Sequence, residues 1–150
     1  MTQTNLKDAI VNKLEELKNK INRPKITIYD EKVRQGFTEP CFFVQFLLNT
    51  HRHLIDNRYE RLNSIEIMYF SDKKDTKEDY DLMTEYLFGE LKYIYTEDDS
   101  EHPIRATEDM TAEVVDDVLH VTVNYDYHLI TKENGVKMKY KEQGVDILDG

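Results

Sequence analysis

The sequence predicts an α+β fold, a mostly antiparallel sheet with two helices packed on one face and a long hairpin between the second and third strands. Three observations predict it: two segments with helical spacing of apolar residues, several segments with strand patterns, and turn residues between those strands. A chain of 150 residues normally forms one domain, and folding at this size buries about 68–70% of the surface that the unfolded chain exposes. We therefore expect a single domain over residues 1–150, with a mobile C-terminal tail from about residue 131.

Apolar residues near the N-terminus recur at steps of three and four, which places them on one stripe of an α-helix. They are Leu6, Ile10, Leu14, Leu17 and Ile21. Pro24 should end this helix, because the residue before a proline is pushed away from helical dihedral angles and the ring removes a backbone donor. A short strand over residues 25–29 and a polar connection over residues 30–40 follow.

The next segment predicts the long hairpin. Residues 41–48 form an almost unbroken apolar run, too short for a typical helix, so we expect a strand covered on both faces. Residues 49–57 are polar and end in a turn at Asp56-Asn57. Residues 58–70 return as a long strand with alternate residues on one face, namely Ile65, Ile67 and Tyr69. The tip of this hairpin should reach beyond the sheet.

A second helix is expected from Asp75 or Thr76 to about Tyr95, because Asp75 followed by Glu78 resembles a capping box. Its buried stripe would be Tyr80, Met83, Leu87, Leu91 and Ile94. Residues 96–109 are rich in acids and are expected to form a mobile loop.

Strands over residues 110–115 and 118–130 should then pair through a two-residue turn at Asp116-Asp117. Alternate residues of the second of these strands face inward: Val121, Val123, Tyr125, Tyr127 and Leu129. In the C-terminal tail, Val136, Met138 and Tyr140 alternate like a short strand.

The charge is unevenly distributed along the chain, whose formal net charge is −10. Residues 1–70 hold eleven basic and nine acidic residues, whereas residues 71–101 hold four basic and eleven acidic ones. This balance disfavours sequence-specific nucleic-acid binding, which needs a clustered Lys and Arg surface. The single cysteine cannot form an internal disulfide, and neither a signal peptide nor a membrane-spanning apolar run is visible. We therefore expect a soluble cytosolic protein without membrane contact.

Two groups of histidines and acids could suggest chemistry, and each has a plainer interpretation. His51 and His53 would share a strand face and could bind a metal with Asp56 nearby, but no fourth ligand is visible. Asp126 and His128 also share a face and could form an acid–base pair if His120 oriented them. They lie opposite the inward tyrosines, so exposed polar residues are the simpler interpretation.

Cys41 could act as a nucleophile only in an electropositive, partly exposed site, whereas its neighbours Phe42 and Phe43 indicate an apolar one. The sequence also has no phosphate-binding glycine loop, nucleophile elbow or zinc-finger spacing. We therefore predict that the protein is not an enzyme and has no catalytic residues, no metal site and no cofactor.

Binding features are more prominent than catalytic ones. Positive and aromatic side chains gather on the long hairpin of an otherwise acidic chain, and Arg and Tyr are enriched in protein interfaces. The candidate subunit or partner interface is Arg52, Arg58, Tyr59 and Arg61. The alternative is an ordinary solvent-exposed hairpin with charge pairs between its strands.

Taken together, several segments resemble the small tail terminator proteins encoded in phages and prophages of Gram-positive bacteria. The resemblance runs from the first helix to about Ile130 and rests on many positions of low individual specificity. Its main stretch is residues 28–70, with Gly36, Pro40 and the run from Asn57 to Arg61. It continues in Val114-Val115-Asp116-Asp117-Val118-Leu119-His120 and Tyr125-Asp126-Tyr127-His128.

This resemblance implies a structural protein that forms a ring, by implication a hexamer of identical subunits, at the head-proximal end of the phage tail tube. The partners it implies are further copies of the chain, the tail tube protein and the head–tail connector protein. The protein would assemble in the cytoplasm of the bacterial host and remain in the tail of the virion. The alternative function is a small non-catalytic protein-binding or regulatory module of a prophage.

Overall fold

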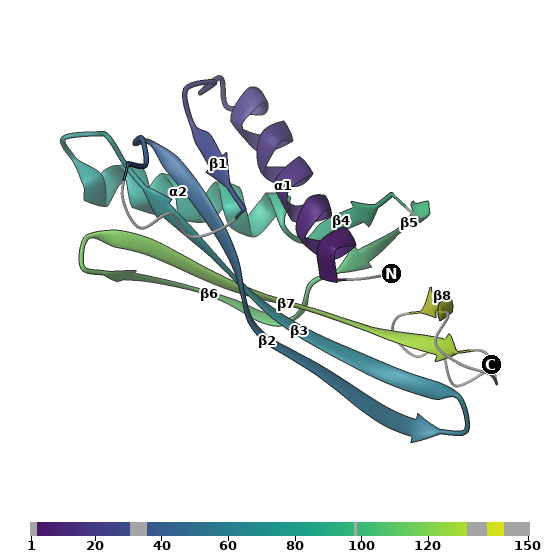
Figure 1. Ribbon diagram of the computed structural model, residues 1–150. Coiled ribbons are helices and arrows are strands. Elements are labelled where there is room, and N and C mark those ends of the chain that lie inside the picture. The colour runs from purple at the N-terminus through teal and green to yellow at the C-terminus, as the bar shows by residue number, and fades with distance from the viewer. Residues whose placement is uncertain (1–2, 31–35, 98, 132–137, 143–150) are drawn as a thin grey trace.

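A six-stranded sheet forms one layer of the protein and two helices cover one of its faces (Figure 1). The computed structural model describes residues 3–30, 36–97, 99–131 and 138–142. The sheet has the order β1-β2-β3-β7-β6, with β8 also paired to β7, and a separate hairpin is formed by β4 and β5. Among the described strands, β1 and β2 form the one parallel pair. The predicted α+β fold is confirmed.

The elements in chain order are α1 (Gln3–Lys20), β1 (Thr27–Tyr29), β2 (Cys41–Ile55), β3 (Arg58–Phe70), α2 (Thr76–Glu90), β4 (Tyr93–Thr96), β5 (Asp99–Arg105), β6 (Thr107–Val115), β7 (Val118–Thr131) and β8 (Met138–Glu142). Neither helix combines the length and apolar character needed to span a bilayer, among the residues described.

Helix α1 buries the predicted stripe: Leu6, Ile10, Leu14 and Leu17 are at most 1% exposed. The helix stops at Lys20, before Pro24, because Asn22 adopts a φ of 58° and Arg23 N–H donates to the Lys18 carbonyl at 2.8 Å. A residue in the left-handed region just past the last turn is a common way to satisfy the final carbonyls of a helix.

The core lies between the helices and the sheet. The residues predicted to alternate inward on β3 and β7 are buried there, since Ile65, Ile67 and Tyr69 are fully buried and the inward residues of β7 are at most 2% exposed. Asp116 and Asp117 both have positive φ, 51° and 61°, as the two central residues of a type I′ hairpin turn require. The predicted turn between β6 and β7 is confirmed.

Strand β2 differs from its prediction in two ways. It continues without interruption through residues 49–55, which were expected to form a polar connection, and the turn comes only at Asp56-Asn57. It is covered on both faces only as far as Val44, because Leu47 and Leu48 are 50% and 61% exposed. The helices do not extend over the outer half of this hairpin (Figure 1).

The second helix is shorter than predicted, and the prediction of a mobile loop after it is wrong. Helix α2 begins at Thr76 with Asp75 as its N-cap, whose carboxylate accepts from Glu78 N–H at 3.1 Å, but it ends at Glu90. Residues 93–96 form β4, and β5 and the start of β6 occupy the segment expected to be a loop. The apolar stripe is buried as expected because Leu91 and Ile94 continue into the core from the connection and from β4. Tyr125 Oη donates to the Leu91 carbonyl at 2.5 Å, so a residue of β7 satisfies the helix end.

The C-terminal segment contributes β8, which pairs with β7 from His128 to Thr131. Of the three residues predicted to alternate there, Met138 and Tyr140 lie in β8 and Val136 lies outside the described residues. The predicted mobile tail falls largely on residues 132–137 and 143–150, which are also outside them, and so stays a prediction.

A buried polar network joins the end of α1, the end of β3 and the start of α2. The Asp79 carboxylate is its centre and accepts from Tyr69 Oη at 2.7 Å, Ser71 Oγ at 2.5 Å and Arg23 Nη1 at 2.9 Å. Burial alone would raise the pKa of Asp79, but the hydrogen bonds from Ser71 and Tyr69, with the charge of Arg23, hold that pKa below its ordinary value. Asp79 is therefore an ionised group that the fold has enclosed with donors.

Cys41 is fully buried, as predicted, and packs with Phe43 and Met68 on the face of the sheet opposite the helices. Burial, with a smaller contribution from the charge of Glu39, raises the pKa of its thiol to about 12.

We expect Cys41 to react far more slowly with a charged thiol reagent in the native protein than in denaturant, because a buried thiol with a raised pKa presents almost no thiolate. The Cys41→Ser variant should lose about 1–3 kcal/mol of unfolding free energy, the cost of an unpaired buried hydroxyl. Labelling followed by mass spectrometry, with urea titration of both proteins, measures the two effects. Equal labelling rates in the native and unfolded states would disprove burial as the cause.

Candidate subunit interface

The outer half of the β2–β3 hairpin carries all four candidate interface residues and extends away from the helical layer together with the end of β7 (Figure 1). Strand register assigns them to two faces, because side chains alternate along a strand. Tyr59 and Arg61 lie on the face that carries the helices, in register with the buried Leu129 and Tyr127. Arg52 and Arg58 lie on the opposite face. The four residues therefore form two surfaces, not one patch.

The helix-side surface is an aromatic cluster centred on Tyr59. His51 stacks on the Tyr59 ring with centroids 4.5 Å apart and an interplanar angle of 12°, and His53 contacts the same ring at 4.9 Å. Arg61 lies directly across from His51 and donates to its Nδ1 from Nε at 3.3 Å. His53 Nε2 lies 2.7 Å from the Asp56 carbonyl oxygen in the turn. These contacts hold the side chains in place at the tip.

Arg61 supplies the net charge of this surface. Its contacts within the described part of the chain are to His51, a neutral acceptor, and not to a carboxylate. Desolvation and the charge of Arg61 both lower the pKa of His51, which favours the neutral imidazole as the acceptor for Arg61. Among the described residues no acid contacts Arg61, and its positive charge suits contact with an acidic partner.

The opposite surface is internally balanced. Arg52 Nη1 lies 3.1 Å from Glu60 Oε1, and the other oxygen of Glu60 lies 3.3 Å from His128 Nε2. Glu66 pairs with His120 in the same way at 3.3 Å. Arg58 lies in register with Ile55 and Ile130 and has interactions of its own. On this face Arg52 is paired with a carboxylate, whereas Arg61 on the other face contacts no acid among the described residues.

The groups considered for chemistry have other partners. His51 and His53 do share a face, as predicted, but the Tyr59 ring contacts both of them. Asp126 and His128 also share a face, yet Asp126 accepts from Thr107 and His128 pairs with Glu60. No group of three or more His, Cys, Asp or Glu side chains is placed to hold a metal ion within the described ranges.

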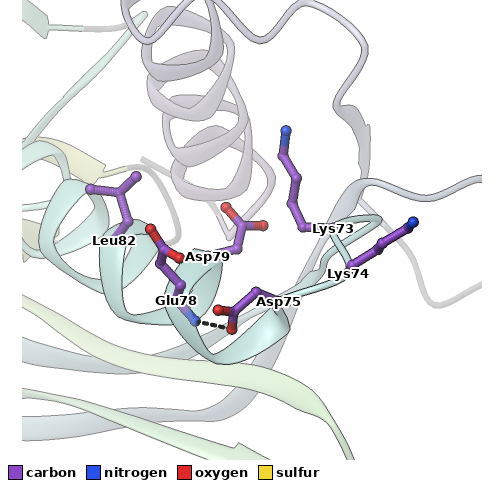
Figure 2. A pocket seen from close by; sticks show the side chains of 6 residues that line it. All are labelled: Lys73, Lys74, Asp75, Glu78, Asp79 and Leu82. Carbon is purple, nitrogen blue, oxygen red and sulfur yellow. Dashed lines mark hydrogen bonds between the residues drawn. The ribbon is translucent and has the colours of Figure 1, made fainter.

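A hollow of about 330 Å³ lies at the start of α2, lined by Lys73, Lys74, Asp75, Glu78, Asp79 and Leu82 (Figure 2). Asp75 is engaged as the N-cap of α2, and Asp79 is engaged with Arg23, so neither carboxylate is free for a ligand. Both lysine side chains extend away from the two acids (Figure 2). The hollow is therefore a consequence of how the helix begins.

Comparison with known families decides what kind of protein carries this hairpin. A family model described as phage tail terminator protein matches residues 5–137, which include all but the first two residues of α1, the whole of α2 and strands β1 to β7. The chain belongs to this family. The resemblance found in the sequence is thus confirmed at the level of the tail terminator family.

Comparisons with curated proteins and with solved structures do not define the function of this tail terminator further. No curated protein matches its sequence. Among the solved structures that match, one aligns with a TM-score of 0.42 and 12% identity over 90% of this chain and 99% of its own length. A similarity at that level carries no argument about fold or function.

The sequence missed one feature near the interface, the acidic hairpin formed by β4 and β5. Its segment was expected to be a loop, although the apolar Ile94 and Ile104 pair across the two strands and are buried. Glu97 and Glu101 are exposed on it. Strand β5 contacts β7, and the hairpin lies toward the end of the molecule where β8 is found (Figure 1).

Proposed function

We propose that this tail terminator is a structural, non-catalytic protein that closes into a ring, a hexamer of identical subunits, at the head-proximal end of the phage tail tube and joins the tube to the head connector. Membership of the tail terminator family over residues 5–137 carries this proposal. The subunits assemble in the host cytoplasm and remain in the virion tail. The tube protein and the connector protein are its other partners.

Within the ring, the helix-side cluster at the hairpin tip meets an acidic surface of the next subunit. A ring repeats one patch against a different patch, so opposite charges on the two patches favour ring closure over a symmetric dimer. Arg61 supplies the positive charge, and the β4–β5 hairpin, with Glu97 and Glu101 exposed, supplies the negative surface. The two features lie on different elements of the subunit, β3 and the β4–β5 hairpin, so one copy can offer Arg61 to the acids of the next copy.

The experiment uses a phage that lacks this gene and therefore accumulates separate heads and tails. Purified wild-type protein should restore joined particles, counted by electron microscopy. Arg61→Glu should restore markedly fewer, because the reversed charge faces acids across the contact, and the loss should shrink when Glu101→Lys is added in the same chain. Wild-type activity should fall as salt rises, since the Debye length decreases from about 10 Å at 0.1 M to about 3 Å at 1 M.

The matched controls separate the contact from net charge. Lys73→Glu removes a positive charge from the start of α2, far from the hairpin tip, and should leave joining intact. Glu85→Lys makes the same change of charge as Glu101→Lys, but on the exposed side of α2 and not on the β4–β5 hairpin. It should therefore not rescue Arg61→Glu. Failure of the wild-type protein to join heads to tails would refute the proposed function. Full activity of Arg61→Glu would refute only the assigned contact.

A further inference from the structure

The outer edge of the long hairpin is an unpaired strand. On the side away from β3, β1 covers β2 only from Cys41 to Phe43, and no other described strand pairs with the remaining length. After the bulge at Leu47, β2 runs in unbroken register from Leu48 to His53. An open edge of this length is a template for pairing with another chain, and proteins that do not use such edges protect them.

This edge lacks two of the usual means of protection, lysine and proline, and its two bulges leave a regular stretch from Leu48 to His53 between them. Strand β2 has the sequence CFFVQFLLNTHRHLI, which contains neither proline nor lysine. Four large apolar side chains on it are 42–63% exposed: Leu47, Leu48, Leu54 and Ile55. Edge strands that avoid association are normally short, bulged or charged, and β2 has 15 residues with Arg52 as its one Lys, Arg, Asp or Glu residue. This edge has the composition of one that becomes covered.

Main-chain groups point outward at three known positions. Asn63 N–H is directed toward β7, where it contacts Asp126 Oδ1 at 3.1 Å, so it does not bond to the directly opposed Asn49 on β2. In an antiparallel pair, opposed residues either exchange both hydrogen bonds or turn both sets of groups away from each other. Asn49 and, at steps of two, His51 and His53 therefore present N–H and C=O groups to the open side.

We propose that this edge binds β8 of a second copy of the chain by antiparallel main-chain pairing, so that the sheet continues from one subunit into the next. The inference rests on the proposed ring and names the strands that close it. Three features of the subunit support β8 as the occupant.

The first two features are the direction of β8 relative to β2 and the level of the two strands along the sheet. Strands β2, β3, β7 and β8 are successively antiparallel, so β8 runs opposite to β2. An identical subunit placed beside the first in the same orientation would therefore offer β2 an antiparallel strand. Strand β8 pairs with residues 128–131 of β7, and these lie level with the segment of β2 that begins at Arg52. Among the described strands, the open edge of β2 and the outer edge of β8 thus occur at the same level of the sheet.

The third feature is the charged contact already described. Joining β2 to the neighbour's β8 brings the helix side of the hairpin tip toward the end of the neighbour that carries the β4–β5 hairpin (Figure 1). Arg61 would then face the exposed acids of that hairpin. Main-chain pairing and charge complementarity therefore require the same arrangement of subunits.

The test replaces a single outward N–H. Proline at position 51 removes that donor without breaking the ladder to β3, because an edge strand tolerates proline where its N–H faces away. His51→Ala removes the same side chain and keeps the donor. Light scattering of concentrated protein should give a mass above the monomer for wild type. Both variants lose the contacts of the His51 imidazole with Tyr59 and Arg61, so the effect of the missing donor is the weaker association of His51→Pro relative to His51→Ala. Circular dichroism should show all three folded.

Cross-linking identifies the strand that is bound. In the double variant His53→Cys with Lys141→Cys, a short bifunctional thiol reagent should produce a ladder of covalent oligomers. Within one subunit β2 and β8 are separated by three strand spacings, about 14 Å, so a reagent of shorter reach cannot join them internally. Each single cysteine variant should give no ladder, and wild-type Cys41 is buried and serves as the background control.

The outcomes distinguish this inference from the proposed function. A ladder from the double variant alone, together with weaker association of His51→Pro than of His51→Ala, supports pairing of β2 with β8. A dimer cross-linked through His53→Cys alone would show a two-fold β2–β2 contact and overturn it. Equal association of the two His51 variants, or a wild-type protein that stays monomeric when concentrated, would also overturn the strand pairing. If the same wild-type protein joins phage heads to phage tails, that result would still support the terminator function.

Discussion

Replacing Asp79 by alanine should lower the free energy of unfolding by about 2–4 kcal/mol, since removing one member of a largely buried charged network leaves its partners without an acceptor. Three donors lose their acceptor at once: Arg23, Tyr69 and Ser71. Urea unfolding followed by circular dichroism measures the loss. The matched control is Asp72→Ala, because the Asp72 carboxylate is 45% exposed and lies 3.9 Å from Arg23, so its loss should cost little.

The same carboxylate should make stability depend on pH. In the folded protein the pKa of Asp79 lies below its ordinary value of about 4, and unfolding restores that ordinary value. Its contribution is therefore complete above that ordinary value and is lost as pH falls below it toward the folded pKa. Between pH 7 and pH 3, wild type should lose more stability than Asp79→Asn, which cannot titrate. Parallel losses in the two proteins would show that other groups cause the acid sensitivity.

Ile67→Ala should reduce the free energy of unfolding by about 2–5 kcal/mol, because Ile67 is fully buried in the central strand between Val44 and Val121. The cost combines the lost transfer of the side chain from water with the cavity that remains. Ile55→Ala is the control of identical chemistry. Ile55 is 63% exposed at the hairpin tip, so its change should stay within about 0.5 kcal/mol.

The same pair of variants tests the interface. If the hairpin tip is covered in the assembled ring, Ile55→Ala should weaken association while leaving the isolated subunit as stable as wild type. Ile67→Ala should lower the stability of the subunit first. An Ile55→Ala protein that unfolds as easily as Ile67→Ala would mean that the tip is part of the subunit core, contrary to its exposure.

Local patterns were sufficient for most of the fold. The stripe of α1, the N-cap of α2 and the turn at Asp116-Asp117 were all predicted, because helix periodicity, capping and turn residues act over a few neighbouring positions. The error at the end of α2 has the same origin. Leu91 and Ile94 continue the helical spacing, but Tyr125 binds the Leu91 carbonyl and β4 pairs with β5, and both partners are distant in sequence.

The candidate site was predicted less completely. All four candidate residues lie on the hairpin, as predicted, but two lie on one face of the sheet and two on the other. The face of each residue is set by the register between β2, β3 and β7, which connects distant parts of the chain. Residues 49–55 were interpreted as a connection because they are mostly polar. They form a strand whose outer edge is exposed to solvent. Polar composition reports solvent contact, and an edge strand has that contact without being a loop.

By itself, the sequence determined that this protein is an α+β tail terminator with its apolar stripes and turns in order, since these depend on residue type and short-range spacing. Only the tertiary structure decided which residues share a surface and which backbone groups remain unpaired. The separation of Arg61 from Arg52, the enclosure of Asp79 and the open edge at His51 all follow from pairings between distant segments. Such pairings are set by the packing of the whole chain, because burial of the common core selects one register among several that local preferences allow.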